Sequence, residues 1–356
     1  MATSLVASFV HGYLDDRKPI NQDELPALWV SDDIGSKVHN YPFPRNPEDF
    51  ASLGDLLIGE MPLGNADSFR RLPRFGLTGL SETSDYLFAG SWNSVYRIRK
   101  SDWGLDGIIS NRLMNDMHGI WVDESSIVSV LTGKDTVVIS DHDGEVIEHF
   151  TVKNDLSVVT EEAIEKFDWR FLTKQFRGAT GLWHFNYVQR FGDEIWLTSR
   201  NLSSFIVVNL KSRKAYIRAM NQKTVVLLHD GLKYENEYYF TSIDGKILIA
   251  AEAESASFEI REKTSHIEQF NRDLVCELIR LDETAFGREP NWCRGIACKD
   301  DVIYVTVDGR YGSDLSFGVV GLKRSGEKVV ERRLRWRDVG AEEDLKYVTG
   351  FDVAAI

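Results

Sequence analysis

The chain is poor in cysteine, since its 356 residues include only Cys276, Cys293 and Cys298. A small, odd number of thiols provides no disulfide framework and is typical of the reducing cytoplasm, where we expect this protein. Cys293 and Cys298 lie on opposite faces of an expected strand, so they do not form a metal-binding pair. We therefore expect buried, inert thiols.

Long apolar runs and an excess of positive charge are also missing. No run of about eighteen apolar residues occurs, so the sequence predicts no transmembrane helix. The first stretch, MATSLVASFVHGYLDD, has no basic segment before its short apolar part, which argues against a secretory signal. With 42 basic and 55 acidic residues the net charge is −13, so we expect neither nucleic acid nor a membrane surface as a partner.

Common catalytic signatures are absent as well: there is no Gly-rich phosphate loop, no serine elbow and no HExxH motif. What the chain has instead is a recurring triplet of a polar residue, glycine and an apolar residue, each copy preceding a strand-like segment. The copies are Thr78-Gly79-Leu80, His118-Gly119-Ile120, Thr180-Gly181-Leu182, Asp230-Gly231-Leu232, Arg294-Gly295-Ile296 and Thr349-Gly350-Phe351. A repeat of this kind sets the whole architecture.

The clearest copy of the repeat covers residues 117–152 and predicts four short strands. These are expected at residues 118–122, 127–131, 136–140 and 145–151. Asp-Gly and Ser-Gly pairs between alternating apolar runs mark tight hairpin turns in this and other copies. Repeated four-stranded units of this length are typical of a β-propeller.

We predict an all-β fold in which residues 1–356 form one six-bladed β-propeller. The innermost strands are expected near residues 76–81, 118–122, 181–189, 227–234, 292–298 and 349–356. The last copy has no outer strands, so the N-terminal segments SLVASFV, ALWVSDD and SKVHNY are expected to supply them. Strands from both chain ends would then close one blade and leave no open sheet edge.

Three segments depart from the four-strand rhythm and are expected as insertions on the rim. Residues 46–75 look partly helical, and residues 160–177 predict a helix capped by Thr160. Residues 262–282 fit either a helix or an outer strand with a long connection. Insertions of this kind can cover a channel.

The innermost strands of a propeller run beside its channel, and alternate side chains face it. Aligning the copies predicts one layer of polar side chains around the axis. This layer comprises Thr78, His118, Asn186, His229, Arg294 and Thr349. Asp116, His184 and Trp292 are expected two residues earlier on the same face, which brings three of the eight histidines together on consecutive blades.

Imidazoles that converge from rigid strands are natural ligands of a transition metal. We expect His118, His184 and His229 to bind a divalent metal ion, with Asp116 as a further ligand. The alternative is that these histidines only form hydrogen bonds to water or to backbone in a wet channel.

Three further residues complete the predicted site. The forked guanidinium of Arg294 suits the carboxylate or phosphate group of a small polar or anionic substrate. Asn186 would orient the metal ligands, and Asp230 or a histidine not bound to metal would act as the base.

The segments MHGIWVDESSIVSV and RGIACKDDVIYVTV resemble the two inner strands of six-bladed propellers of the gluconolactonase, strictosidine-synthase and NHL-repeat groups. The pattern HGI…D…I.V is also similar to virginiamycin-lyase-like propellers. The resemblance covers about residues 76–310 and implies, for the lyase-like group, a metal in the channel that serves an elimination. The acidic ligands of the gluconolactonase type have no clear counterparts here, so the histidine-rich site is more similar to propeller lyases that act on uronates or cyclic esters.

Three functional hypotheses follow from the sequence. The first is a metal-dependent lyase or hydrolase that acts on a small polar or anionic substrate in the channel. The second is a non-catalytic binding propeller that grips a protein or glycan through the rim segments 46–75 and 160–177. The third is a metal-free enzyme with His118 or His229 as general base.

Overall fold

The computed structural model describes most of the chain, and the statements below concern that part alone. The described residues are 3–11, 28–32, 35–41, 75–162, 165, 169–170, 183–202, 204–219, 228–242, 245–252, 260–263, 266–269, 274–280, 292–309, 316–335 and 348–356. The predicted insertions at 46–75 and 160–177 fall almost entirely outside these residues. The described part is almost wholly strand, with a short 3-10 helix at Thr132–Lys134 (η4).

Within the described residues the strands form six antiparallel sheets of four or five strands each, numbered here in chain order. Sheet 1 combines Leu5–His11 (β1), Leu28–Ser31 (β2), Ser36–His39 (β3), Phe75–Gly76 (β4) and Val348–Ala355 (β28). Sheet 2 contains Leu80–Glu82 (β5), Tyr86–Gly90 (β6), Val95–Arg99 (β7) and Leu105–Ile109 (β8). Sheet 3 contains Met117–Val122 (β9), Ile127–Leu131 (β10), Thr136–Ser140 (β11), Val146–Val152 (β12) and Val158–Val159 (β13).

The remaining sheets follow the same meander from the inside outward. Sheet 4 contains Phe185–Phe191 (β14), Glu194–Ser199 (β15), Ser204–Asn209 (β16) and Lys214–Ala219 (β17). Sheet 5 contains Leu228–Tyr234 (β18), Glu237–Ser242 (β19), Lys246–Glu252 (β20) and Leu274–Arg280 (β23). Ile260–Lys263 (β21) and His266–Gln269 (β22) form a separate hairpin, and sheet 6 contains Trp292–Lys299 (β24), Val302–Gly309 (β25), Ser316–Lys323 (β26) and Lys328–Arg335 (β27).

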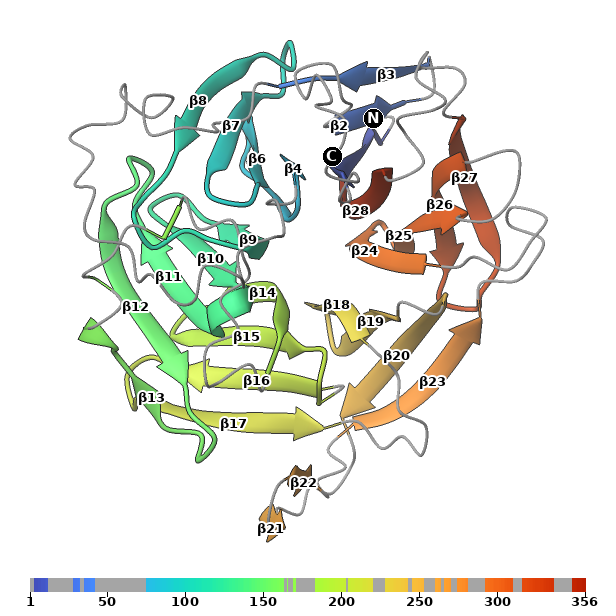
Figure 1. Ribbon diagram of the computed structural model, residues 1–356. Coiled ribbons are helices and arrows are strands. Elements are labelled where there is room, and N and C mark those ends of the chain that lie inside the picture. Colours follow the sequence, from blue (N-terminus) through green and yellow to red (C-terminus); the bar gives the residue numbers. More distant parts are fainter. Residues whose placement is uncertain are drawn as a thin grey trace, which may run out of the picture.

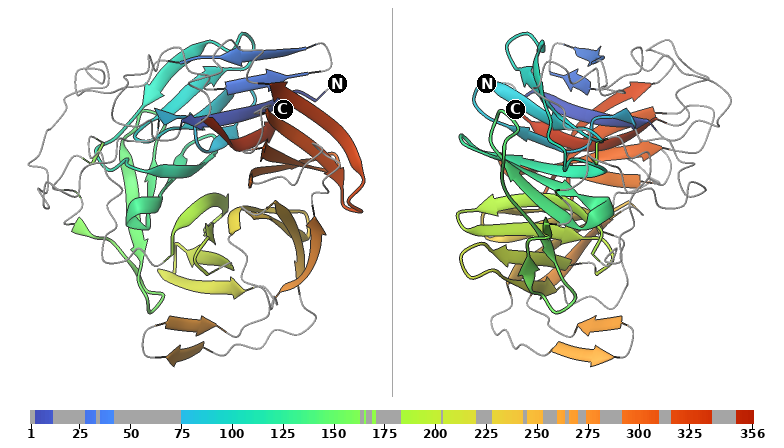
Figure 2. Two further views of the ribbon diagram at one scale, coloured as in Figure 1. Left: turned by 45° about the vertical axis from the view of Figure 1, so that its right-hand side comes forward. Right: turned by 60° about the vertical axis from the view of Figure 1, so that its left-hand side comes forward.

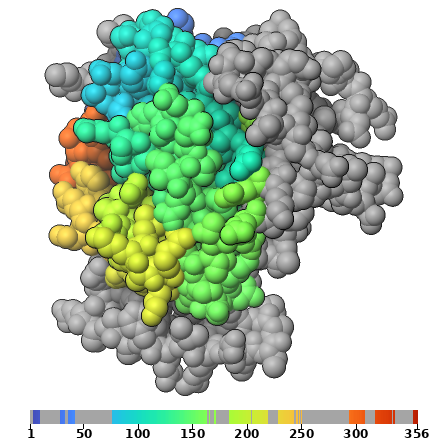
Figure 3. Space-filling model, turned by 90° about the vertical axis from the view of Figure 1, so that its left-hand side faces the viewer, coloured from blue at the N-terminus to red at the C-terminus, as the bar shows by residue number. Residues whose placement is uncertain are grey.

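The six sheets stand around a common axis, with β28, β9, β14, β18 and β24 nearest to it (Figure 1). The turned views show the same ring from two sides, and both chain ends lie next to each other in all of them (Figure 2). On the outer wall, sheets 2, 3 and 4 follow one another from blue-green to yellow (Figure 3). The predicted all-β propeller is therefore confirmed as the fold class.

The hydrophobic core is divided among the contacts between sheets. The buried apolar residues form six clusters, and each cluster joins two neighbouring sheets of the ring. One cluster packs Phe9 and Trp29 of sheet 1 against Phe317 of sheet 6, so the first and last sheets are joined like any other pair. Packing of alternating apolar side chains between twisted sheets is what the strand pattern in the sequence provides.

The first and last strands of the described chain pair with each other. β1 and β28 are antiparallel, with Leu5 opposite Ala355 and His11 opposite Val348. Of the two alternatives for residues 262–282, the outer strand is observed, because β23 pairs with β20 along its whole length. Among the described residues, every helix is too short or too polar to span a bilayer.

Candidate functional site at the propeller axis

Within the described residues, an extra residue interrupts the innermost strand of five of the six sheets where it passes the axis. In β9 the partners of Val130 and Leu131 are Gly119 and Met117, so His118 is the additional residue. In β14 the additional residue is Asn186, which falls between the partners of Ser199 and Thr198. Such β-bulges bend a strand and redirect one side chain, here toward the axis.

The same irregularity recurs in sheets 5, 6 and 1. In β18, His229 and Asp230 together oppose Thr241, and in β24, Arg294 and Gly295 together oppose Thr306. In β28, Phe351 and Asp352 oppose Ser8. Two adjacent residues of a regular strand would point to opposite faces. The bulge in β18 instead lets the side chains of His229 and Asp230 meet.

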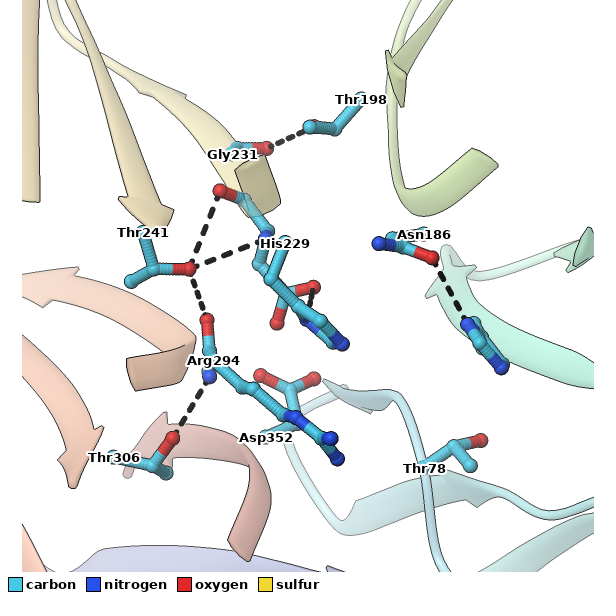
Figure 4. Close-up of polar contacts among 12 residues, drawn as sticks. Thr78, Asn186, Thr198, His229, Gly231, Thr241, Arg294, Thr306 and Asp352 are labelled. Atoms are coloured by element: carbon cyan, nitrogen blue, oxygen red, sulfur yellow. Dashed lines mark hydrogen bonds and ion pairs between the residues drawn. The ribbon is translucent and has the colours of Figure 1, made fainter. Parts of the chain in front are cut away.

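In sheets 1 and 5, a hydroxyl on the second strand forms hydrogen bonds to the bulge and to the next sheet of the ring. Ser8 Oγ accepts a hydrogen bond from the Asp352 amide at 3.0 Å and donates one to the Thr78 carbonyl at 2.8 Å. Thr241 Oγ1 accepts from the Asp230 amide at 3.1 Å and donates to the Arg294 carbonyl (Figure 4). We call these contacts the hydroxyl bridges.

The glycines of the repeated triplet allow neighbouring innermost strands to touch. A Cβ on Gly295 would lie 2.4 Å from the Cα of Asp352 in the adjacent sheet. A Cβ on Gly119 would lie 2.8 Å from the carbonyl oxygen of Asn186, again in the adjacent sheet. The glycine position is therefore a sheet-to-sheet contact, and the polar position before it faces the axis.

The structure brings the three predicted histidines together. The ring centroid of His118 lies 5.9 Å from that of His184 and 6.4 Å from that of His229. His118 and His229 are buried, while His184 is half-buried and has a left-handed backbone with φ of 50°. The carboxylate of Asp135, in the turn before β11, accepts hydrogen bonds from the His184 amide at 2.8 Å and the Trp183 amide at 3.1 Å. These bonds fix the backbone just before β14.

Each central histidine has a polar neighbour on a rigid strand. Nδ1–H of His118 donates to Oδ1 of Asn186 at 3.0 Å, and Nε2 of His118 lies 3.5 Å from Oδ1 of Asp116. Nδ1 of His229 lies 2.8 Å from Oδ1 of Asp230. These contacts orient both imidazoles, as partners of functional histidines do.

Burial controls the charge of the site. Burial lowers the pKa of His229 well below its ordinary value, and the positive charge of Arg294 and the nearby His118 lower it further. Burial raises the pKa of Asp230 well above its ordinary value, with a further increase from the neighbouring Asp352 and an opposing effect from Arg294. His229 is therefore neutral at pH 7, and Asp230 favours its protonated form.

Asp352 is an axial residue that the sequence analysis missed. Burial raises its pKa to about 7, although its carboxylate accepts hydrogen bonds from the amides of Leu80 at 2.7 Å and Val353 at 2.8 Å. Because Leu80 belongs to sheet 2, this carboxyl joins sheets 1 and 2 next to Arg294 (Figure 4). The predicted layer included Thr349 of the same strand. The side chains of Thr349 and Trp292 lie outside the described residues.

The predicted metal centre stays a prediction. No group of three or more His, Cys, Asp or Glu side chains within them is arranged so that it could hold a metal ion. The rings of His118 and His229 are nearly parallel, with an interplanar angle of 16°, and both Nδ1 atoms face a polar partner within the protein. The histidines converge within a hydrogen-bonded polar layer, and a polar partner at Nδ1 is also usual for histidines that bind a metal through Nε2.

Comparison with known proteins supports the propeller fold and identifies no family for the chain. No protein-family model matches the chain, and no curated protein matches it either. A solved nidogen/laminin complex has a TM-score of 0.50 at 11% identity, over 99% of this chain and 97% of that one. The propeller groups named above from the sequence are not matched by a family model.

Two other solved structures are similar over a smaller part. The β-propeller domain of Cps50 (Swd1) from Myceliophteria thermophila has a TM-score of 0.43 and 12% identity, over 73% of this chain and 75% of that one. A member of the DUF4221 family from Bacteroides vulgatus has a TM-score of 0.40 and 10% identity, over 78% and 86%.

Proposed function

We propose that this chain is a six-bladed, non-catalytic binding propeller that binds a basic protein surface. The six sheets and the six hydrophobic clusters between them support the blade number, with β1 and β28 closing the ring. The proposal rests on one observation: exposed carboxylates occupy the turns that join the innermost strand of a blade to its second strand. These first turns are residues 83–85, 123–126, 192–193, 235–236 and 300–301.

Every first turn in sheets 2 to 6 carries at least one exposed acidic side chain. They are Asp85, Glu124, Asp193, Glu235, Asp300 and Asp301. Because the innermost strands all run the same way, these turns share one face of the propeller and surround the axis there. We call this surface the acidic face.

Contacts between neighbouring turns support this arrangement. Arg190 of sheet 4 donates to Ser126 Oγ in the first turn of sheet 3 at 3.0 Å. Burial and then the charge of Glu235 raise the pKa of Tyr234, and Asp301 of the next sheet acts on the same hydroxyl. The turns of adjacent sheets are thus neighbours in space, and their charges add.

Most of these carboxylates have no ion-pair partner within the described residues. The exception is Asp193, whose Oδ2 lies 2.5 Å from Nζ of Lys211. Glu235, Asp300 and Asp301 have positive φ angles of 53°, 51° and 60°. Aspartate is common in such turns, whereas glutamate is not, so Glu235 does not follow from turn chemistry alone. Like charges held together in this way attract a partner of opposite charge and speed its association.

Two triple variants test the proposal. The first reverses three carboxylates of the acidic face, and the second reverses three exposed carboxylates on outer turns of the same side. The variants are Asp85→Lys with Glu124→Lys and Asp193→Lys, and Asp143→Lys with Glu145→Lys and Glu327→Lys. Both change the net charge equally, so they separate local recognition from overall charge.

The probe is an octalysine peptide, whose binding is measured by fluorescence anisotropy at low and at physiological salt. We expect the acidic-face variant to bind at least about tenfold more weakly and the outer-turn variant to stay within about threefold of the parent. Equal losses in both variants would show that only net charge matters and would overturn the proposal.

The convergence of His118, His184 and His229 favours a second candidate, the metal-dependent lyase or hydrolase with a small anionic substrate. Metal analysis of the protein after dialysis against Zn²⁺ or Mn²⁺ tests it. One equivalent of metal that is lost in His118→Ala and His229→Ala supports this function. No bound metal in the parent protein refutes it.

A further inference from the structure

We infer that the propeller axis contains a binding site for the oxyanion group, carboxylate or phosphate, of a small molecule. The site is built by Asn186, Thr78 and Arg294 around the central histidines. It is separate from the acidic face and does not depend on the binding of a protein there.

The first argument is the side-chain amide of Asn186, of which only the oxygen has a hydrogen-bond partner within the described residues. Asn186 is 1% exposed, and its Oδ1 accepts from Nδ1–H of His118 at 3.0 Å. Its Nδ2 is buried and has no hydrogen-bond partner within the described residues. Because the oxygen is committed to His118, the group presented to the axis is the N–H₂ donor.

A second buried donor lies beside sheet 2, two sheets away from Asn186 along the ring. Thr78 is 5% exposed, and its Oγ1 also lacks a hydrogen-bond partner within the described residues. Buried polar side chains are nearly always satisfied, so two such groups around one axis indicate a missing partner. In Figure 4 the side chains of Asn186, His229 and Arg294 reach the central region from three strands, and Thr78 lies at its edge between β4 and β5.

The third argument is charge. Arg294 is 8% exposed, and its guanidinium stays charged at any physiological pH. In Figure 4 its side chain lies beside those of His229 and Asp352 in the central region.

The ligand class follows from the groups that surround the central region. An amide N–H₂, a hydroxyl and a guanidinium are donors, so their common partner must accept hydrogen bonds and carry negative charge. Carboxylate and phosphate both meet this requirement. Because the residues are buried, the bound group belongs to a small molecule or to a slender end of a larger one.

Isothermal titration calorimetry with three probes tests the site: malate, inorganic phosphate and uncharged glycerol. We expect saturable binding of malate or phosphate below about 10 mM and none of glycerol. Saturation by malate alone assigns a carboxylate ligand, and saturation by phosphate alone assigns a phosphate ligand. The absence of saturable binding of either anion, or equal binding of glycerol, would overturn the inference.

Two conservative variants and one control locate the binding. Asn186→Asp keeps the shape but places a carboxylate at the axis, and Thr78→Val removes only the hydroxyl. The control is Ser129→Ala, which removes another buried hydroxyl without a partner in the described residues, on β10. We expect at least about tenfold weaker anion binding in Asn186→Asp, a smaller loss in Thr78→Val and no change in the control.

Circular dichroism establishes that each variant is folded, and the two axial variants provide independent readouts if one is not. Anion binding that is unchanged in both axial variants would refute the assignment. Octalysine binding should be unaffected in all three, so failure of the axial site and failure of the acidic face are distinguishable.

Discussion

Gly295 provides the sharpest test of how the sheets meet at the axis. An alanine Cβ at this position would lie 2.4 Å from Cα and 2.6 Å from the carbonyl carbon of Asp352, and 2.7 Å from the amide nitrogen of Val353. All three atoms are backbone, so they cannot turn aside as a side chain would. Overpacking of a core costs about 1–3 kcal/mol where side chains can adjust. We expect Gly295→Ala to lower the free energy of unfolding by about 3 kcal/mol or more.

Equilibrium unfolding in urea, followed by tryptophan fluorescence, measures this effect. Gly35→Ala is the matched control, because a Cβ at Gly35 meets nothing within 4 Å. We expect the control to change stability by less than about 0.5 kcal/mol. If Gly295→Ala were as stable as Gly35→Ala, the glycine position would not be a close sheet-to-sheet contact, and the reasoning would be refuted.

Three further predictions concern buried polar groups. Thr241→Val removes one hydroxyl bridge and should cost about 1–3 kcal/mol in urea unfolding, and a cost near zero would contradict the bridging role. Because burial raises the pKa of Asp352 from 3.8 to about 7, the folded protein holds a proton that the unfolded chain releases. Stability should therefore fall as pH rises from about 4 to 7, by up to about 1.4 kcal/mol per pH unit from this group, and Asp352→Asn should flatten that slope in thermal melts. Lys134 is buried, and its Nζ donates to the carbonyl oxygen of Leu113 at 2.8 Å. Lys134→Met leaves this oxygen without that donor and should lower stability by about 1–3 kcal/mol, an effect that an unchanged urea midpoint would disprove.

The strand pattern was predictable to within a residue or two where the apolar alternation is regular. In sheet 3 the expected strands at 118–122, 127–131, 136–140 and 145–151 correspond to β9, β10, β11 and β12. The fold class followed from the same repeat. Periodicity could not decide the region of β23, because a short apolar run fits either a helix or a strand.

The axial site was predictable only in part, because a bulge is invisible to a strictly alternating pattern. Alternation places Asp230 on the face opposite to His229, yet the bulge in β18 brings their side chains within 2.8 Å. Asp352 was overlooked for the same reason. Strict alternation from Thr349 places Phe351 on the same face as Thr349, and the bulge in β28 puts Asp352 at the axis instead. Asp135 was missed because it acts from a turn between strands of another blade, at a sequence distance of 49 residues from His184.

The pairing of β1 with β28 has a consequence for biosynthesis. Leu5 and Ala355 stand opposite each other, so β1 cannot pair with β28 until about 350 further residues have been synthesised. At about 5–20 residues per second, this delay is roughly 20 to 70 s. During that time one edge of an apolar strand has no partner, which is the kind of segment that associates with other chains. Nascent protein should therefore be most vulnerable to aggregation, and most in need of a chaperone, at its N-terminal strand.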